Sequence, residues 1–139
     1  MPCGLFLAAA LAASPATTAL TSEPLFAEIV AKAEALETEA LTLKGSPAAD
    51  LGAFTTKISA LSALDMQAHL TLKARGVDGD LKCILKGISE DLPKKVAALA
   101  EAKEPFARGI AADEIVALLD DNAQVILQPP GPATPPPAE

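Results

Sequence analysis

The chain has 139 residues, enough for one domain with a modest core, and it carries 18 Asp and Glu against 11 Lys and Arg, for a formal net charge of −7. Such an acidic chain repels the phosphates of nucleic acids. With four Phe and neither Trp nor Tyr, it also lacks the aromatic platforms on which bases and sugars stack. We therefore exclude nucleic acid as a partner.

The first 21 residues predict a secretory signal peptide. No charged side chain precedes Glu23, and an apolar run extends from Leu5 to Ala13, too short for the ~20 residues that span a bilayer. Small residues at 14–19 have the spacing of a cleavage site. Because the segment contains no Lys or Arg, the alternative is an apolar N-terminal helix that packs on the rest of the chain. The signal predicts a secreted protein.

The remainder divides into a helical domain, residues 22–128, and a proline-rich tail, residues 129–139. The tail reads PPGPATPPPAE, a composition that forms neither a packed helix nor a sheet. We expect it to be extended and disordered.

Two cysteines are present, Cys3 and Cys83. If Cys3 leaves with the signal peptide, Cys83 has no partner within the chain. A single cysteine in a helical pattern is typically a small buried hydrophobe, and we expect this for Cys83. Pairing between two chains is the alternative.

Two helices are predicted before residue 76. The first begins with Ser22 as N-cap and ends at Gly45, and the second begins at Pro47 and runs to about Arg75, with Gly76 closing it. Apolar residues recur at intervals of three and four, which is typical of helices with one buried face. These stripes comprise Phe26, Ile29, Ala33, Leu36, Ala40 and Leu43, and then Leu51, Phe54, Ile58, Leu61, Leu64, Ala68 and Leu72.

The third helix is predicted from Leu81 to Leu99, after a turn at residues 78–80. Pro93 lies inside it, and a proline removes a backbone donor and clashes one turn back. We expect a kink near Ser89, because the stripe stays in phase across Pro93. Two short helices are the alternative.

The fourth helix follows Pro105, with a break near Gly109 and a firm start near Ala112. Phe106 and Ile110 are expected to face inward with the aliphatic residues that follow. No segment alternates with period two, and every connection is short. The sequence therefore predicts an all-α protein, an up-down four-helix bundle whose sequential helices are antiparallel and whose third helix is kinked at Pro93.

No arrangement of side chains predicts catalysis, a cofactor or a metal. His69 is the single histidine, so no nucleophile–base–acid set is available, and we interpret it as structural or exposed. The acidic pairs lack the alternating ligands of a calcium loop. Four lysines on the third helix are interpreted as a solvated face, with an anionic head-group site as the alternative. They are Lys82, Lys86, Lys94 and Lys95.

The apolar faces are wide, and Ala-rich facing positions either bring helices close or leave a cavity between them. A cavity of this kind binds lipid-like molecules without catalytic residues. The alternative is that the extra apolar positions pack or form a dimer face. Six residues are predicted to line the ligand site: Phe26, Ile29, Phe54, Ile58, Ile84 and Ile88.

Several features carry a resemblance to a known family. An Ala/Leu-rich helix ends at Leu43-Lys44-Gly45, a polar turn spans residues 76–80, and the stretch from Leu85 to Phe106 ends in a Lys/Pro/Phe corner. In these features the chain resembles the fungal hydrophobic surface-binding protein A and cell-wall galactomannoprotein family. It departs from the family pattern after that corner, where only one helical segment precedes the proline tail. The resemblance implies a secreted or cell-wall, all-helical, non-catalytic protein that binds a hydrophobic surface or a fatty-acid-like lipid.

Together these patterns predict a secreted, non-catalytic protein that binds a fatty acid, another lipid or a hydrophobic surface. The alternative is a structural or interaction module that forms a homodimer or docks a partner helix.

Overall fold

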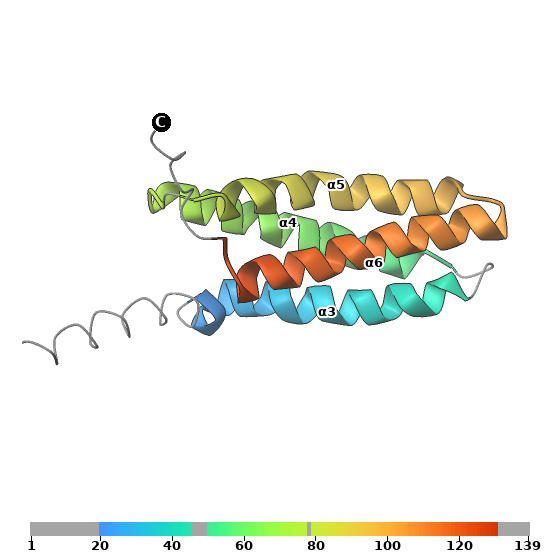
Figure 1. Cartoon of the computed structure of the whole chain (residues 1–139), viewed down its shortest axis with the longest axis horizontal. Helices are drawn as coiled ribbons and strands as arrows, with labels where there is room; N and C mark the ends of the chain where they lie inside the picture. Colours follow the sequence, from blue (N-terminus) through green and yellow to red (C-terminus); the bar gives the residue numbers. More distant parts are fainter. Residues whose placement is uncertain (1–19, 46–49, 78, 131–139) are drawn as a thin grey trace, which may run out of the picture.

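The computed structural model describes residues 20–45, 50–77 and 79–130, and in these ranges the regular secondary structure is helical, without strands. The all-α prediction is therefore confirmed. Four long helices lie lengthwise beside one another (Figure 1): α3 (Pro24–Lys44), α4 (Gly52–Ala74), α5 (Leu81–Glu101) and α6 (Pro105–Leu127). The predicted signal peptide and proline tail fall mostly on residues 1–19 and 131–139, outside the described residues.

The helix starts differ from the predicted ones. The N-cap of α3 is Glu23 rather than Ser22, because Pro24 takes the first helical position, where its missing N–H costs nothing. The prediction that the second helix begins at Pro47 was wrong, since α4 begins at Gly52. There the Asp50 carboxylate accepts a hydrogen bond of 2.9 Å from the Gly52 N–H, which satisfies a donor at the helix start.

Gly76 ends α4 as predicted. Its φ of 65° is left-handed, a conformation that glycine adopts without steric cost. The Gly76 N–H donates to the Lys73 carbonyl at 3.0 Å, and the Val77 N–H donates to the Leu72 carbonyl at 3.3 Å. These two bonds form a Schellman motif, which stops the helix.

The predicted break near Gly109 does not occur, since α6 is continuous from Pro105. Pro105 starts the helix, and the Arg108 N–H already bonds to the Glu104 carbonyl at 2.9 Å. The expectation that Phe106 and Ile110 face inward was also wrong, because these side chains are 81% and 48% exposed. The first two turns of α6 present them to solvent, and burial begins at Ala111.

One continuous core joins the helices. α3 packs against α4 and α6, and α5 packs against the same two helices, with the α3–α4 pair the least extensively packed. The predicted stripes supply most of the buried positions. The fully buried large side chains are Phe26, Ile29, Phe54, Ile58, Leu61, Leu85, Leu92, Leu99, Ile115, Leu119, Asn122 and Ile126.

Pro93 lies inside α5, which continues through it as one helix. A proline at this position cannot donate to the carbonyl four residues earlier, that of Ser89. The Ser62 hydroxyl on α4 donates to that carbonyl at 2.5 Å. A neighbouring helix thus satisfies the acceptor that the proline leaves open. A bend near Ser89 stays a prediction.

Candidate ligand-binding groove

The six residues predicted to line a ligand site lie in two different places. Phe26, Ile29, Phe54 and Ile58 are at most 1% exposed and belong to the core shared by α3 and α4 with their neighbours. Ile84 and Ile88 lie on α5 and line a groove of about 420 Å³ against α6, in which none of the other four takes part.

The α5–α6 groove has an apolar floor and a polar rim. Ile84, Ile88, Leu118 and Val125 supply the apolar side chains. The rim contains one carboxylate and no cation, and its residues are Asp121, Gln124, Gln128 and Pro130. An anionic ligand finds no opposite charge in this lining.

A second groove, of about 380 Å³, lies between α3 and α4. Its α3 side presents Lys32, Ala35, Leu36 and Glu39, which follow the spacing of one helix face. Its α4 side presents Thr56, Lys57 and Ala60. Small alanines line both walls of this hollow, and α3 and α4 are the least extensively packed of the helix pairs in contact. This volume is in the range of small-molecule sites, about 300–1,000 Å³.

The α3–α4 groove also carries two ammonium groups. Lys57 on α4 pairs across the groove with Glu39 on α3 at 2.9 Å, and these side chains are 55% and 32% exposed. Lys32 pairs along its own helix with Glu28 at 3.6 Å. The groove therefore combines an apolar lining with cations at its rim, which the α5–α6 groove does not.

A third hollow, of about 310 Å³, lies where the end of α3 meets the start of α6. Phe106 and Ile110 line it, and the Lys44–Asp113 ion pair of 2.8 Å closes one side. Phe106 is the most exposed of the large apolar side chains in the described residues.

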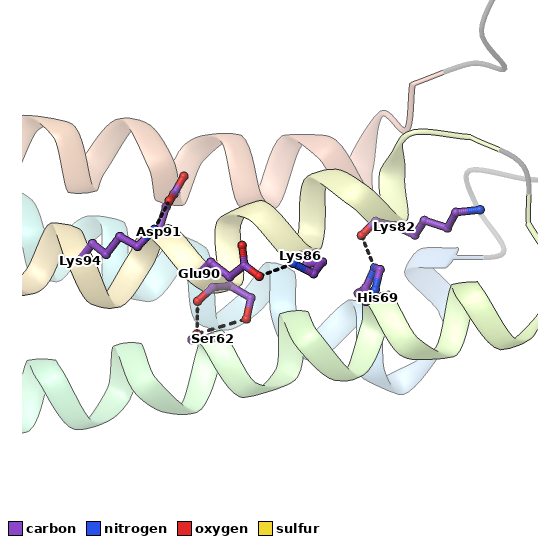
Figure 2. Close-up of polar contacts among 8 residues, drawn as sticks. Ser62, His69, Lys82, Lys86, Glu90, Asp91 and Lys94 are labelled. Carbon is purple, nitrogen blue, oxygen red and sulfur yellow. Dashed lines mark hydrogen bonds and ion pairs between the residues drawn. The ribbon is translucent and has the colours of Figure 1, made fainter.

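Three polar side chains of α4 bond to separate neighbours inside the bundle. On α4, Ser62, Asp65 and His69 follow one another at helical spacing, yet each bonds to a different neighbour. The His69 Nδ1 lies 2.6 Å from the carbonyl oxygen of Lys82, and Ser62 bonds to α5, as Figure 2 shows. Asp65 Oδ1 accepts a hydrogen bond of 2.8 Å from the Asn122 amide on α6. The sequence reasoning missed this pair, because an Asp in an otherwise apolar stripe gives no indication of a partner 57 residues away.

Burial raises the pKa of Asp65 to about 7, and the hydrogen bond from Asn122 opposes that rise. At the surface, the hydrogen bond with Arg75 lowers the pKa of Glu23, and burial opposes that effect. This bidentate contact ties the start of α3 to the end of α4. It is an interaction of the fold and lies outside the grooves.

The α5 lysines are engaged within the chain. Lys86 pairs with Glu90 and Lys94 with Asp91, and Lys95 reaches Glu114 on α6 at 3.3 Å (Figure 2 shows the first two pairs). The Lys82 ammonium donates to the Val77 carbonyl at 2.6 Å. The prediction that Cys83 is buried was wrong, because this cysteine lies on the exposed face of α5.

Among the described residues, no three His, Cys, Asp or Glu side chains are grouped so that they could hold a metal ion. Within the same ranges, no helix has both the length and the apolar character needed to cross a membrane.

Comparisons of the chain with known protein families, with curated proteins and with solved structures find no match.

Proposed function

We propose that the protein is a non-catalytic binder of a small molecule with an apolar chain, which it holds in the groove between α3 and α4. One observation carries this proposal: the walls of that groove are built from Ala35, Leu36 and Ala60, which leave an apolar hollow of about 380 Å³. The ligand then lies at the α3–α4 edge of the core and not at its centre, where the predicted lining residues Phe26 and Phe54 are fully buried.

The energetics favour an acyl or alkyl chain. Each methylene that moves from water into the groove contributes about 0.8 kcal/mol, before the cost of ordering the ligand. The groove also lies between the two neighbouring helices, α3 and α4, that are the least extensively packed against each other. Leu36 is 4% exposed and gives the hollow an apolar floor without closing it.

The architecture we propose for this binder is an up-down four-helix bundle. Support comes from the alternating course of the helices in Figure 1 and from the contacts of α3 and α5 with the same two neighbours. Secretion belongs to the same proposal and rests on the sequence of residues 1–21, whereas attachment to a cell wall rests on the family resemblance alone.

The proposal is tested by adding 1-dodecanol, a neutral amphiphile, to the full chain with ¹³C-labelled alanine methyl groups. We expect saturable shifts of the Ala35 and Ala60 methyl signals and little change at Ala123, which is buried in the core. Shifts confined to residues outside the groove, or none at all below the solubility limit of the alcohol, would overturn the proposal.

A second candidate function rests on Phe106. A phenyl group that is 81% exposed beside Ile110 favours a surface that docks a partner helix or a second copy of the chain. Light scattering over a range of protein concentrations separates the two candidates. A mass that stays that of one chain argues against self-association through this surface.

A further inference from the structure

The ion pair between Lys57 and Glu39 crosses the α3–α4 groove, whereas the ion pair of the other lysine in the groove, Lys32, does not. Both members line the α3–α4 groove, and their 2.9 Å contact joins one wall to the other. Lys32 also lines the groove, but its partner Glu28 does not, and that pair runs along α3. At about 1.5 Å per residue, Lys32 and Glu39 are separated by about 10 Å along the helix axis. The Lys57 ammonium is thus the cation held across the groove.

This ion pair is easily exchanged. Lys57 is 55% exposed and Glu39 is 32% exposed, so water and salt screen their attraction. Exposed pairs of this type contribute about 0–1 kcal/mol to stability. Replacement of Glu39 by a ligand anion therefore costs little free energy, because the displaced carboxylate returns to water.

The apolar lining and the ammonium have separate effects on a ligand. Burial of the chain in the groove supplies affinity irrespective of the head group. The charge at Lys57 then favours a negative head group, whereas the Glu39 carboxylate competes for the same ammonium and repels that head group. Lys57 and Glu39 together therefore act on the selectivity of the groove for the charge of the head group.

We propose, resting on the proposed function, that Glu39 forms an ion pair with the Lys57 ammonium in the free protein. When an amphiphile binds, its anionic head group replaces Glu39 as the partner of Lys57. The groove is in this way selective for single-chain molecules that end in a carboxylate or a phosphate. Lys57 is the residue that determines this specificity, and Glu39 is its internal competitor.

The test compares four probes that share one chain length: dodecanoate, dodecyl phosphate, 1-dodecanol and dodecyltrimethylammonium. The three ionic probes are used below their critical micelle concentrations and the alcohol below its solubility limit. Binding to the full chain is measured by titration of the Ala60 methyl signal. For Lys57→Gln we expect dodecanoate and dodecyl phosphate to bind about two- to fivefold more weakly, with dodecanol unchanged. For Glu39→Gln we expect both anions to bind about two- to fivefold more tightly. If one anion responds and the other does not, the responding head group identifies the class of ligand.

Lys86→Gln is the matched control, because it removes an ion-paired lysine from α5, outside the groove. It should leave the binding of all four probes unchanged. Equal responses of the anions and dodecanol to Lys57→Gln would overturn the head-group inference and leave groove binding intact. Failure of every probe to shift Ala60 would instead overturn the proposed function.

Discussion

Asp65 on α4 and Asn122 on α6 meet inside the core, where both side chains are fully buried and the Asn122 amide donates to Asp65 Oδ1 at 2.8 Å. Among the described residues, the other oxygen of each group, Asp65 Oδ2 and Asn122 Oδ1, has no hydrogen-bond partner. A neutral carboxylic acid has a hydroxyl to donate, whereas a carboxylate has only acceptors. Burial therefore favours the protonated form of Asp65, whereas the hydrogen bond from Asn122 favours the carboxylate and is the smaller effect.

The first prediction concerns pH. The pKa of Asp65 is raised from 3.8 to about 7 in the folded protein, so the folded state binds the proton more tightly than the unfolded state. The contribution of this group to stability is fully present below about pH 4 and decreases as pH rises to about 7. One pKa unit corresponds to about 1.4 kcal/mol, so the whole decrease is on the order of 4 kcal/mol. Urea unfolding between pH 4 and pH 8 measures it.

Asp65→Asn is the control for this prediction, since it keeps the shape and cannot titrate. The difference in unfolding free energy between wild type and Asp65→Asn should change across pH 4–7. If the two proteins keep a constant difference over that range, Asp65 is not the titrating group.

The second prediction concerns the partner. Asn122→Leu removes the donor and leaves Asp65 buried alone, which should lower the free energy of unfolding by about 1–3 kcal/mol. The double variant Asp65→Leu, Asn122→Leu replaces both polar groups and should recover most of that loss. Chemical denaturation of the wild type and the two variants provides the comparison. A double variant less stable than Asn122→Leu would show that the pair stabilises the core beyond satisfying Asp65.

The third prediction concerns Pro93. Ser62→Ala removes the hydroxyl that bonds to the Ser89 carbonyl and should cost about 1–3 kcal/mol, because that part-buried acceptor then lacks a donor. In a Pro93→Ala background the alanine N–H can bond to the same carbonyl, so the cost of Ser62→Ala should shrink. A double-mutant cycle measures the difference. Equal costs in both backgrounds would contradict this account.

The fourth prediction compares two phenylalanines. Phe54 is 1% exposed and Phe106 is 81% exposed. Phe54→Ala should lower the free energy of unfolding by about 3–5 kcal/mol, because it leaves a cavity. Phe106→Ala should change it by less than about 0.5 kcal/mol, as is typical of exposed positions. A loss above about 1 kcal/mol in Phe106→Ala would show that this ring is buried in solution.

Periodicity predicted the core because a stripe of large apolar residues on one helix face is removed from water only when that face packs against other helices. Phe26, Ile29 and Leu61 were identified on that basis and are fully buried. Phe106 and Ile110 continue the same pattern, yet they lie in the first turns of α6, where no neighbouring helix covers them. Periodicity specifies a face and does not specify whether another element reaches it.

The candidate groove was less predictable. From the sequence, Ala-rich facing positions either bring helices close or leave a cavity, and nothing in it indicated that Ala35 and Ala60 line a hollow. Their pairing depends on the register of α3 against α4. Lys57 and Glu39 are separated by 18 positions, and only the packed helices bring them within 2.9 Å. A search for small residues beside oppositely charged residues on adjacent helices would have reduced the number of candidate binding sites.

The most direct test of groove binding is the affinity of dodecanoate for Ala60→Leu compared with Ala63→Leu. Both alanines are exposed on α4, but only Ala60 lines the groove, so the same change fills the site in one protein and not in the other. With amide spectra confirming that both fold, we predict at least tenfold weaker binding for Ala60→Leu and wild-type affinity for Ala63→Leu, a difference of about 1.4 kcal/mol or more. Equal affinities in the two variants would contradict the proposal that the α3–α4 groove is the binding site.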